Sequence, residues 1–538
     1  MVKRVVKMGR VAARRLRRGM VDARRLARVV WFGLRHFVLS RLFRRLRRTA
    51  PAELTQALMA AKAIEHPPPV LAVTGPDEMA RAWDQGFAAV NAALYLNLQK
   101  PDHLSAWRHA HPAPSFPAIY LWDSAFIAQI WAWWDPSVAA DVLRSVVDGR
   151  DGDRLRHFIA DFARSPFTQP PLIAWSLERL AHSATPEVHD PWLAAMYAPL
   201  RDYKRWLYTH RRTADGLFAW AHAYESGVEN APRFGSRDER TLRDTRRVAA
   251  PDFCAYMVLK CEALAAMARR LGREADATTH EADATALREA VNRTLWDEDE
   301  GLYFDRDTAS GRFVRSRSIA SLLPLWAGIP DARQAARLHA HIVDPESFNT
   351  LIPLPSVALS DAAFEKDMWR GPVWLNTAFA VVEGLHRYGY VETAAELAFR
   401  LCDGVYRTVR LTGHVHEFYD PQQHGIQTLH RKKGNLWKRM TLGGLPVGDF
   451  VGWSGLVNTL VIETLFGLRR RPEGLAITPR FPARAAGQSF RLTLPREDLE
   501  VSVDVSEGGA VSGRATGPWG ETPFDLRFGQ DLLLAPSQ

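Results

Sequence analysis

The chain is poor in cysteine and lacks long hydrophobic runs. Its 538 residues include three cysteines, Cys254, Cys261 and Cys402, and no CxxC pair. All three lie in apolar, helix-like stretches, so the sequence argues against a disulfide framework and predicts buried reduced thiols in a reducing, cytoplasmic compartment. The longest apolar run near the N-terminus, Val29 to Leu34, is too short for a signal peptide or a membrane span, which needs about 20 residues.

Acidic residues are almost absent from residues 1–50, which hold seventeen Lys and Arg against the single acid Asp22. The net charge of the whole chain is only +10, so the remainder is mildly acidic and the sequence pI of about 9.6 is no argument for a nucleic-acid partner. Apolar residues recur at steps of three and four opposite an Arg-rich face, which predicts a basic amphipathic helix. Peripheral contact with an anionic membrane fits this face and its aromatic residues. A dispensable extension is the open alternative.

Motifs for cofactors are also lacking. Gly443-Gly444 does not form a phosphate-binding loop, and Asp297, Asp299 and Gly301 are not followed by the other ligands of a calcium loop. We therefore expect no cofactor and no metal in the functional site.

What the chain does contain is a long series of helix-like segments separated by polar loops. Eleven segments between residues 52 and 470 carry the helical period, and the stretch after Trp122 adds another. Helices of similar length with no fixed-length repeat favour a mainly α (α/α)6 toroid, or barrel, over an open solenoid. Residues 471–538 change to the alternating pattern of strands, with a hairpin signal at Gly508-Gly509, and predict a small antiparallel β unit. The predicted domains are therefore 1–50, 52–470 and 471–538.

Six clusters between the helices combine aromatic residues with groups that bond to hydroxyls or carry protons. Taken alone, each has an ordinary explanation such as a helix cap, a turn or cation–π packing. Together they supply the aromatic faces, fixed polar groups and paired carboxyl groups that a pyranose site requires. The clusters are YLWDSAF (120–126), SPFTQPP (165–171), ESGVENAPRF (225–234), MWRGPVWLN (368–376), HEFYDP (416–421) and FVGWSG (450–455).

In their order along the chain, these motifs resemble the trehalase-like glycoside hydrolases, closest to family 63 and also similar to the family 37 trehalases. The resemblance covers roughly residues 75–470 and implies an (α/α)6 barrel, a carbohydrate substrate and hydrolysis with inversion. By position, it implies that Glu229 is the general acid and Glu417 the general base. It places the following residues in substrate binding: Trp122, Asp123, Gln169, Glu225, Gly227, Arg233, Trp369, Arg370, Trp374, Asn376, Tyr419 and Trp453.

The acid position departs from the family, which normally has Asp where this chain has Glu229. The extra methylene moves the proton donor by roughly 1.3–1.5 Å unless the loop retreats, and a 1 Å misplacement can cost on the order of 100-fold in rate. Glu225, in the same segment, is expected to anchor the loop or line the pocket. His416 and Arg370 are the expected neighbours that keep Glu417 ionised.

Two other functions remain open on the same barrel. An inverting phosphorylase would lack the catalytic base, which Glu417 argues against. A non-catalytic sugar-binding or scaffold protein is kept open by the unusual Glu229. The sugar itself is predicted only as an α-glucoside or α-mannoside.

Overall fold

The structure is a computed structural model that describes residues 62–75, 78–161, 163–235, 244–431 and 442–536. The predicted basic helix over residues 1–50 lies outside this range. The longer helices are α4 (Glu78–Asn97), α5 (Leu121–Trp131), α6 (Pro136–Asp148), α7 (Ile173–Arg179), α8 (Pro186–Arg211), α10 (Pro251–Arg270), α11 (Glu274–Thr294), α12 (Ala332–Val343), α13 (Leu375–Arg387) and α14 (Val391–Thr412). Shorter ones are α9 (Ala223–Ser226) and α16 (Leu456–Thr459), which continues as a π-helix over Leu460–Leu465.

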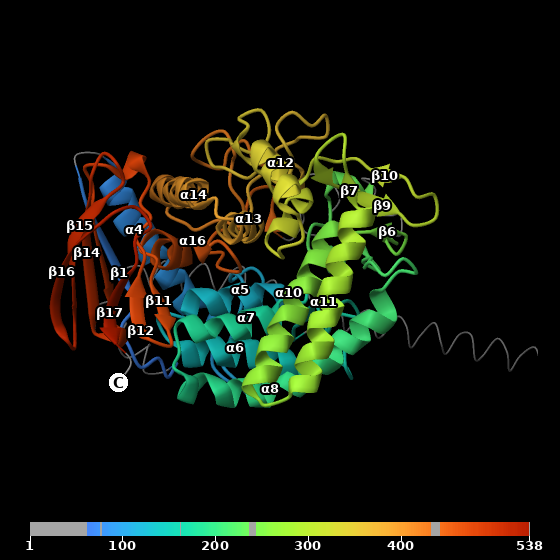
Figure 1. Cartoon of the computed structure of the whole chain (residues 1–538), viewed down its shortest axis with the longest axis horizontal. Coiled ribbons are helices and arrows are strands. Elements are labelled where there is room, and N and C mark those ends of the chain that lie inside the picture. The colour runs from blue at the N-terminus through green and yellow to red at the C-terminus, as the bar shows by residue number, and fades with distance from the viewer. Residues whose placement is uncertain (1–61, 76–77, 162, 236–243, 432–441, 537–538) are drawn as a thin grey trace, which may run out of the picture.

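Six inner segments close a ring. In ring order, α5 contacts α7, α7 contacts α10, and α10 and α13 both contact the short 3₁₀ helix Leu323–Leu325. From α13 the ring continues to α16, and α16 returns to α5. Outer helices pair with this ring as hairpins, for example α5 with α6 and α10 with α11 (Figure 1). This arrangement corresponds to the predicted (α/α)6 barrel, with one inner helix shortened. Pro324 lies in the first turn of that segment, a position that a helix tolerates.

The pattern of buried residues explains which helices form the inner ring of the barrel. Every residue of α5 is buried, so this helix can only stand between other elements. By contrast, α14 buries a broad face, which includes Ala394, Leu397, Leu401 and Val405, and leaves the residues of its opposite side half-buried. Its polar residues can therefore face water on the outside of the ring.

Beside the barrel lie two antiparallel sheets (left in Figure 1). The larger sheet has the order β1-β13-β14-β15-β16, and the smaller has the order β11-β12-β17. Their strands are β1 (Val70–Thr74), β11 (Arg469–Arg471), β12 (Gly474–Ile477), β13 (Ser489–Leu494), β14 (Leu499–Val505), β15 (Val511–Gly517), β16 (Gly520–Leu526) and β17 (Leu532–Pro536).

The predicted boundary at 470/471 needs correction, because β1 belongs to the larger sheet although it precedes the barrel helices. It pairs with β13 from Val70↔Thr493 to Thr74↔Ser489. The sequence places these strands more than 400 residues apart, and only folding brings them together. Among the described residues, no helix is long and apolar enough to cross a membrane.

The remaining strands are short pairs in the loops of the barrel. They are β2 (Leu98–Gln99), β3 (His109–Ala110), β4 (Ile119–Tyr120), β5 (Phe158–Ile159), β6 (Val248–Ala249), β7 (Trp296–Asp297), β8 (Leu302–Tyr303), β9 (Asp305–Asp307) and β10 (Phe313–Val314). Several of them fix loops at the end of the barrel where α5 and α13 begin.

Candidate active site

A pocket opens at the end of the barrel where inner helices begin. Trp122 and Asp123 lie in the first turn of α5, Gln169 precedes α7, and Trp374 is the N-cap of α13. Counted with its open mouth, the empty space in the pocket is about 400 Å³. The predicted site residues that line it are Trp122, Asp123, Gln169, Gly227, Glu229, Trp369, Trp374, Glu417 and Trp453.

Tryptophan rings form one wall of this pocket. Trp369 and Trp374 stack with centroids 3.8 Å apart and planes at 8°, and Trp453 meets Trp122 edge-on at 5.6 Å. The Trp453 indole N–H also donates to the backbone oxygen of Glu417 at 2.8 Å. The wall therefore offers flat apolar surface and at the same time fixes the backbone of the predicted base.

The predicted acid follows a tight turn. Gly227 ends α9 with φ +73°, a conformation that favours glycine, and an added Cβ would lie 2.5 Å from a ring carbon of Trp122. The Ser226 hydroxyl accepts a hydrogen bond from the backbone N–H of Val228 at 3.1 Å. Together these contacts turn the chain so that Glu229, which is buried, lines the pocket.

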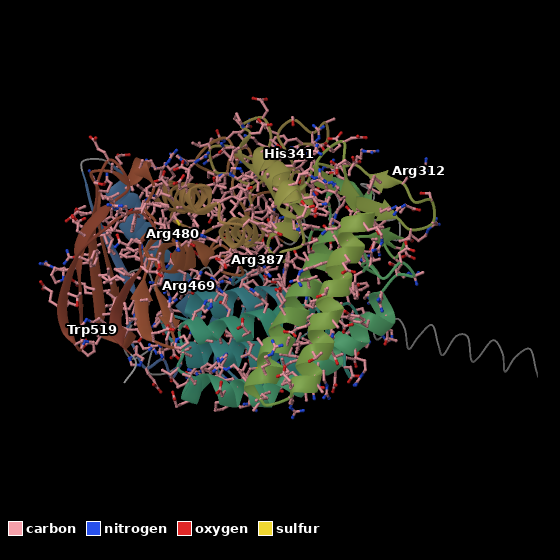
Figure 2. All side chains as sticks on the ribbon, viewed as in Figure 1. Arg312, His341, Arg387, Arg469, Arg480 and Trp519 are labelled. Atoms are coloured by element: carbon pink, nitrogen blue, oxygen red, sulfur yellow. The ribbon has the colours of Figure 1, made fainter. Side chains whose placement is uncertain are left out.

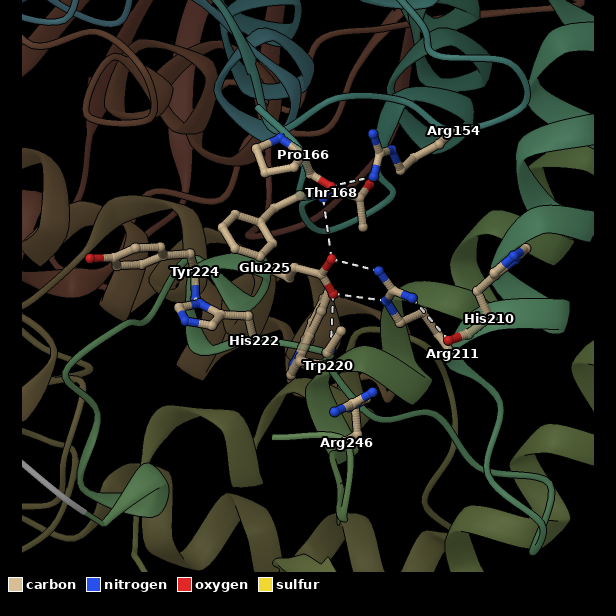
Figure 3. Close-up of polar contacts among 12 residues, drawn as sticks. Arg154, Pro166, Thr168, His210, Arg211, Trp220, His222, Tyr224, Glu225 and Arg246 are labelled. Carbon is tan, nitrogen blue, oxygen red and sulfur yellow. Dashed lines mark hydrogen bonds and ion pairs between the residues drawn. The ribbon is translucent and has the colours of Figure 1, made fainter. Parts of the chain in front are cut away.

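Glu225 anchors this loop and is absent from the pocket lining (Figure 3). Its two carboxylate oxygens accept from the Arg211 guanidinium at 2.8 and 2.7 Å, and one also accepts from the Ala221 N–H at 2.9 Å. The side chain is wholly buried, so this bidentate pair satisfies a charge that would otherwise be costly. Of the two roles that the sequence left open, the geometry fits loop anchoring.

Glu417 is fixed at its backbone and at its carboxylate. Its N–H donates to the Val447 oxygen at 3.0 Å. The carboxylate Oε2 accepts a charge-assisted hydrogen bond from Arg431, whose side chain is fully buried. Sequence reasoning missed Arg431, because it opens the run RKK and a charge run normally lies on a solvated face.

The neighbours expected for Glu417 lie elsewhere. The His416 ring interacts with the Thr412 hydroxyl at 2.9 Å, and burial lowers the pKa of His416 to about 4, so its imidazole is neutral near pH 7. Arg370 donates to the backbone oxygens of Asn230 at 3.3 Å and Ala363 at 3.4 Å. The ion pair that the structure shows at the Glu417 carboxylate is made by Arg431, which the sequence did not suggest.

Four further residues predicted to bind substrate also fall outside the lining: Arg233, Arg370, Asn376 and Tyr419. Arg233 is buried between Asp252 at 2.6 Å and Asp305 at 3.2 Å, where it ties the acid loop to the start of α10. The Tyr419 hydroxyl accepts from the His416 N–H at 2.9 Å and so shapes the base segment. Asn376 is buried in the first turn of α13, and its amide has no hydrogen-bond partner in the described part of the chain.

Six further residues line the pocket, and most of them are aromatic. Burial raises the pKa of Tyr120, and the carboxyl groups of Asp123, Glu229 and Glu417 add to this rise. Tyr120, Met368 and Phe450 lie in clusters that the sequence marks, whereas the other three lining residues carry no motif of their own. The additional lining residues are Pro112, Phe116, Tyr120, His157, Met368 and Phe450.

Within the described ranges, no group of three or more His, Cys, Asp or Glu side chains could hold a metal ion. Asp297, considered above for calcium, instead accepts from Arg315 at 2.6 Å and from the N–H of Asp299 at 3.1 Å. It closes the β7–β8 turn.

Comparison with known proteins agrees with this geometry. Residues 117–430 match the family described as the mannosylglycerate hydrolase MGH1-like glycoside hydrolase domain. The mannosylglycerate hydrolase of Thermus thermophilus is 29% identical over 57% of this chain and 89% of its own length. That of Rubrobacter radiotolerans is 27% identical over 58% of this chain and 88% of its own length. A periplasmic trehalase of Salmonella typhimurium is 25% identical over 46% of this chain and 42% of its own length.

Solved structures show the same fold. A GH63 mannosylglycerate hydrolase of Thermus thermophilus in complex with glucose superimposes with a TM-score of 0.59 at 23% identity. The match covers 70% of this chain and 99% of the other. A GH78 rhamnosidase of Bacillus matches with a TM-score of 0.53 at 12% identity, over 83% of this chain and 40% of its own.

Proposed function

Since the chain belongs to the mannosylglycerate hydrolase MGH1-like family of glycoside hydrolases, we propose that Glu229 is its general acid and Glu417 its general base. The enzyme acts on an α-glycoside, and the family mechanism is inverting. In such a reaction an acid protonates the glycosidic oxygen while a base activates water on the opposite face of the sugar. The observation that carries the proposal is that two glutamates from separate loops line one tryptophan-walled pocket.

The surroundings of the two glutamates support these roles. Arg431 binds only Oε2 of Glu417, and Oε1 has no hydrogen-bond partner in the described part of the chain. One oxygen is therefore held in place while the other is available to a water molecule. Glu229 sits on the turn that Gly227 allows and Glu225 anchors.

Trp122, Trp369, Trp374 and Trp453 would stack on the sugar, while Asp123 and Gln169 would bind its hydroxyls. The relatives named mannosylglycerate hydrolases suggest an α-mannoside with a glycerate aglycone, and the trehalases suggest an α-glucoside. We propose that the substrate belongs to one of these two classes. No cofactor enters the proposed reaction.

The test is a substrate screen with anomer detection by NMR, over mannosylglycerate, glucosylglycerate, trehalose, kojibiose and nigerose. Glu229→Gln and Glu417→Gln should each lower kcat by about 10²–10⁴-fold, the usual contribution of a general acid or base. Glu229→Asp should retain more activity than Glu229→Gln, because it keeps a protonatable group. Near-wild-type rates in both Gln variants would refute the assignment.

The same screen separates the alternatives. Turnover that requires inorganic phosphate would indicate an inverting phosphorylase. Sugar binding without hydrolysis by the wild-type chain would indicate a binding or scaffold protein. Neither alternative explains why Arg431 should hold Glu417 in the wall of the pocket.

We further propose that residues 1–50 hold the enzyme on an anionic membrane surface in the cytoplasm. The Arg-rich face of the sequence and the three buried free cysteines support this placement. Sedimentation with vesicles should show binding to anionic but not to neutral lipid, weakened by salt, and deletion of residues 1–50 should abolish it. Equal sedimentation of the full chain and the deleted form would contradict the proposal.

A further inference from the structure

A second cavity lies at the opposite end of the barrel from the candidate active site. We call it the far-end cavity. Counted with its open mouth, its empty space is about 990 Å³. It is lined from α7, α10, α13, β11 and the end of the 3₁₀ helix Leu323–Leu325 by Trp175, Glu178, Trp326, His386, Arg387 and Arg469, among others. Trp374 and His386 stand at the two ends of α13, so the cavity lies roughly 18 Å from the catalytic pocket, at 1.5 Å per helical residue. A substrate in one pocket does not reach the other.

Three polar side chains of different chemistry face this cavity without a hydrogen bond or ion pair to another residue within the described ranges. They are the carboxyl of Glu178, the imidazole of His386 and the guanidinium of Arg469. Burial raises the pKa of Glu178 and lowers that of His386 to about 4. The imidazole is therefore neutral near pH 7 and both donates and accepts hydrogen bonds.

The other charged groups of the lining are already paired. Glu262 accepts from Arg387 at 2.6 Å and also from Arg288, and Glu383 accepts from Arg179. These two carboxylates therefore already have guanidinium partners inside the protein, and Arg179 also pairs with Glu463. Figure 2 shows Arg387 and Arg469 near each other in the region between α13 and β11.

Tryptophan gives the cavity an apolar wall. Trp175 and Trp326 meet at 77° with centroids 4.9 Å apart, and Leu259, Ala263 and Ala266 of α10 continue this surface. Carboxylates in the lining oppose an anionic ligand, and guanidinium groups oppose a cationic one. A neutral molecule with both hydroxyl groups and an apolar face can bond to the polar side chains and also pack against the tryptophan wall.

From these observations we propose that the far-end cavity is a second binding site for a small neutral saccharide, separate from the catalytic pocket. Glu178, His386 and Arg469 bond to its hydroxyls, and the wall of Trp175 and Trp326 covers its apolar face. The proposal stands whether or not Glu229 and Glu417 have the roles given above.

The test combines crystals soaked with methyl α-D-glucoside and saturation-transfer NMR on the full chain. Wild type should show the sugar at the far-end cavity, and the double variant Glu178→Ala/His386→Ala should lose that density and the matching part of the NMR signal. Hydrolysis rates of the variant should stay within about twofold of wild type. The control Arg312→Ala/His341→Ala, whose labelled side chains lie away from the cavity in Figure 2, should bind as wild type does.

Glucose 6-phosphate and glucosamine test the charge class, and both should bind more weakly than the neutral glucoside. If the double variant does not fold, Arg469→Gln, at the partly exposed edge of the cavity, replaces it with the same expected loss. A wild-type chain without sugar in the far-end cavity, unchanged binding in the variants, or tighter binding of a charged sugar would overturn the proposal.

Discussion

At the scale of single residues, Arg431 is the side chain that most changes the interpretation of the site. Its Nη2 binds Glu417, while its Nε and Nη1 have no hydrogen-bond partner in the described part of the chain. A fully buried guanidinium with unsatisfied donors is costly to the fold, and such groups concentrate at functional sites. We therefore regard Arg431 as a positioning residue for the base.

Replacing Arg431 with Met should lower kcat by about 100-fold and move the acidic limb of the pH profile of kcat/KM to higher pH. The reason is that loss of an adjacent positive charge makes a carboxylate harder to ionise. Arg431→Lys should restore part of both effects, and Arg312→Met, at an exposed loop, should change neither. A lower rate with an unshifted profile would mean that Arg431 only supports the fold.

Lys260 is a second informative residue, fully buried in α10 with its ammonium 4.6 Å from the Tyr203 ring centre. Its Nζ has no hydrogen-bond partner within the described ranges, and burial lowers its pKa from the ordinary 10.5 to about 7. Because the folded state binds the proton less readily than the unfolded chain, stability falls as pH drops from 10.5 to 7. The penalty is complete below pH 7, on the order of 4 kcal/mol.

Lys260→Met should therefore raise the free energy of unfolding by about 2–4 kcal/mol at pH 6, and by less at pH 9. Denaturant titrations at the two pH values measure this difference. An equal gain at both would show that hydrophobic packing, not the charge, is responsible.

At the scale of elements, the acid loop depends on the fit between α9 and α5. Gly227 combines φ +73° with a close approach to Trp122, and these constraints act together. Gly227→Ala should cost about 1–3 kcal/mol of stability and lower kcat at least tenfold, because the loop must move away from the tryptophan wall. Gly389→Ala is the control: this residue also has positive φ, +79°, but has open space around its Cβ position. Its stability loss should be similar, and its activity unchanged.

The ends of the helices show which structural features local sequence signals can predict. Local signals mark both ends of α10, which begins at Pro251, ends at Arg270 and is followed by Gly272 with φ +69°. That signal is local, because a missing N–H and a left-handed glycine act within one turn. The inner segment Leu323–Leu325 has no such local signal, and its position in the ring depends on the helices that pack against it.

At the scale of the whole molecule, the β sheets and the barrel share one core. Phe490 of β13 packs against Trp83 of α4, with ring centroids 5.5 Å apart, and against Phe399 of α14, at 6.5 Å. Strand β1 precedes the barrel helices in the chain but belongs to the larger sheet. Neither the sheets nor the barrel therefore forms a complete core without the other. The family match ends at residue 430, yet the described fold continues to residue 536.

Wild-type protein should therefore unfold in one calorimetric transition, with equal calorimetric and van't Hoff enthalpies. Truncation after residue 468 should yield aggregated or poorly folded protein, because it uncovers the apolar faces of α4 and α14. Two separate transitions, or a stable and active truncated form, would show that the sheets are an independent domain.

The sequence predicted the helical body and the strand-rich end, because hydrophobic periodicity is a local property of the chain. The two glutamates proposed for catalysis came from the resemblance of its motifs to the trehalase-like glycoside hydrolases. The sequence also marked most of the tryptophan wall. Only the tertiary structure decided which charges pair. It assigned Glu225 to Arg211, Arg233 to Asp252 and Asp305, and Glu417 to Arg431. It also joined β1 to β13 and opened a second cavity at the far end of α13. The physical reason is that ion pairs, sheet pairing and cavities depend on the distance between atoms in space, which separation along the chain does not specify.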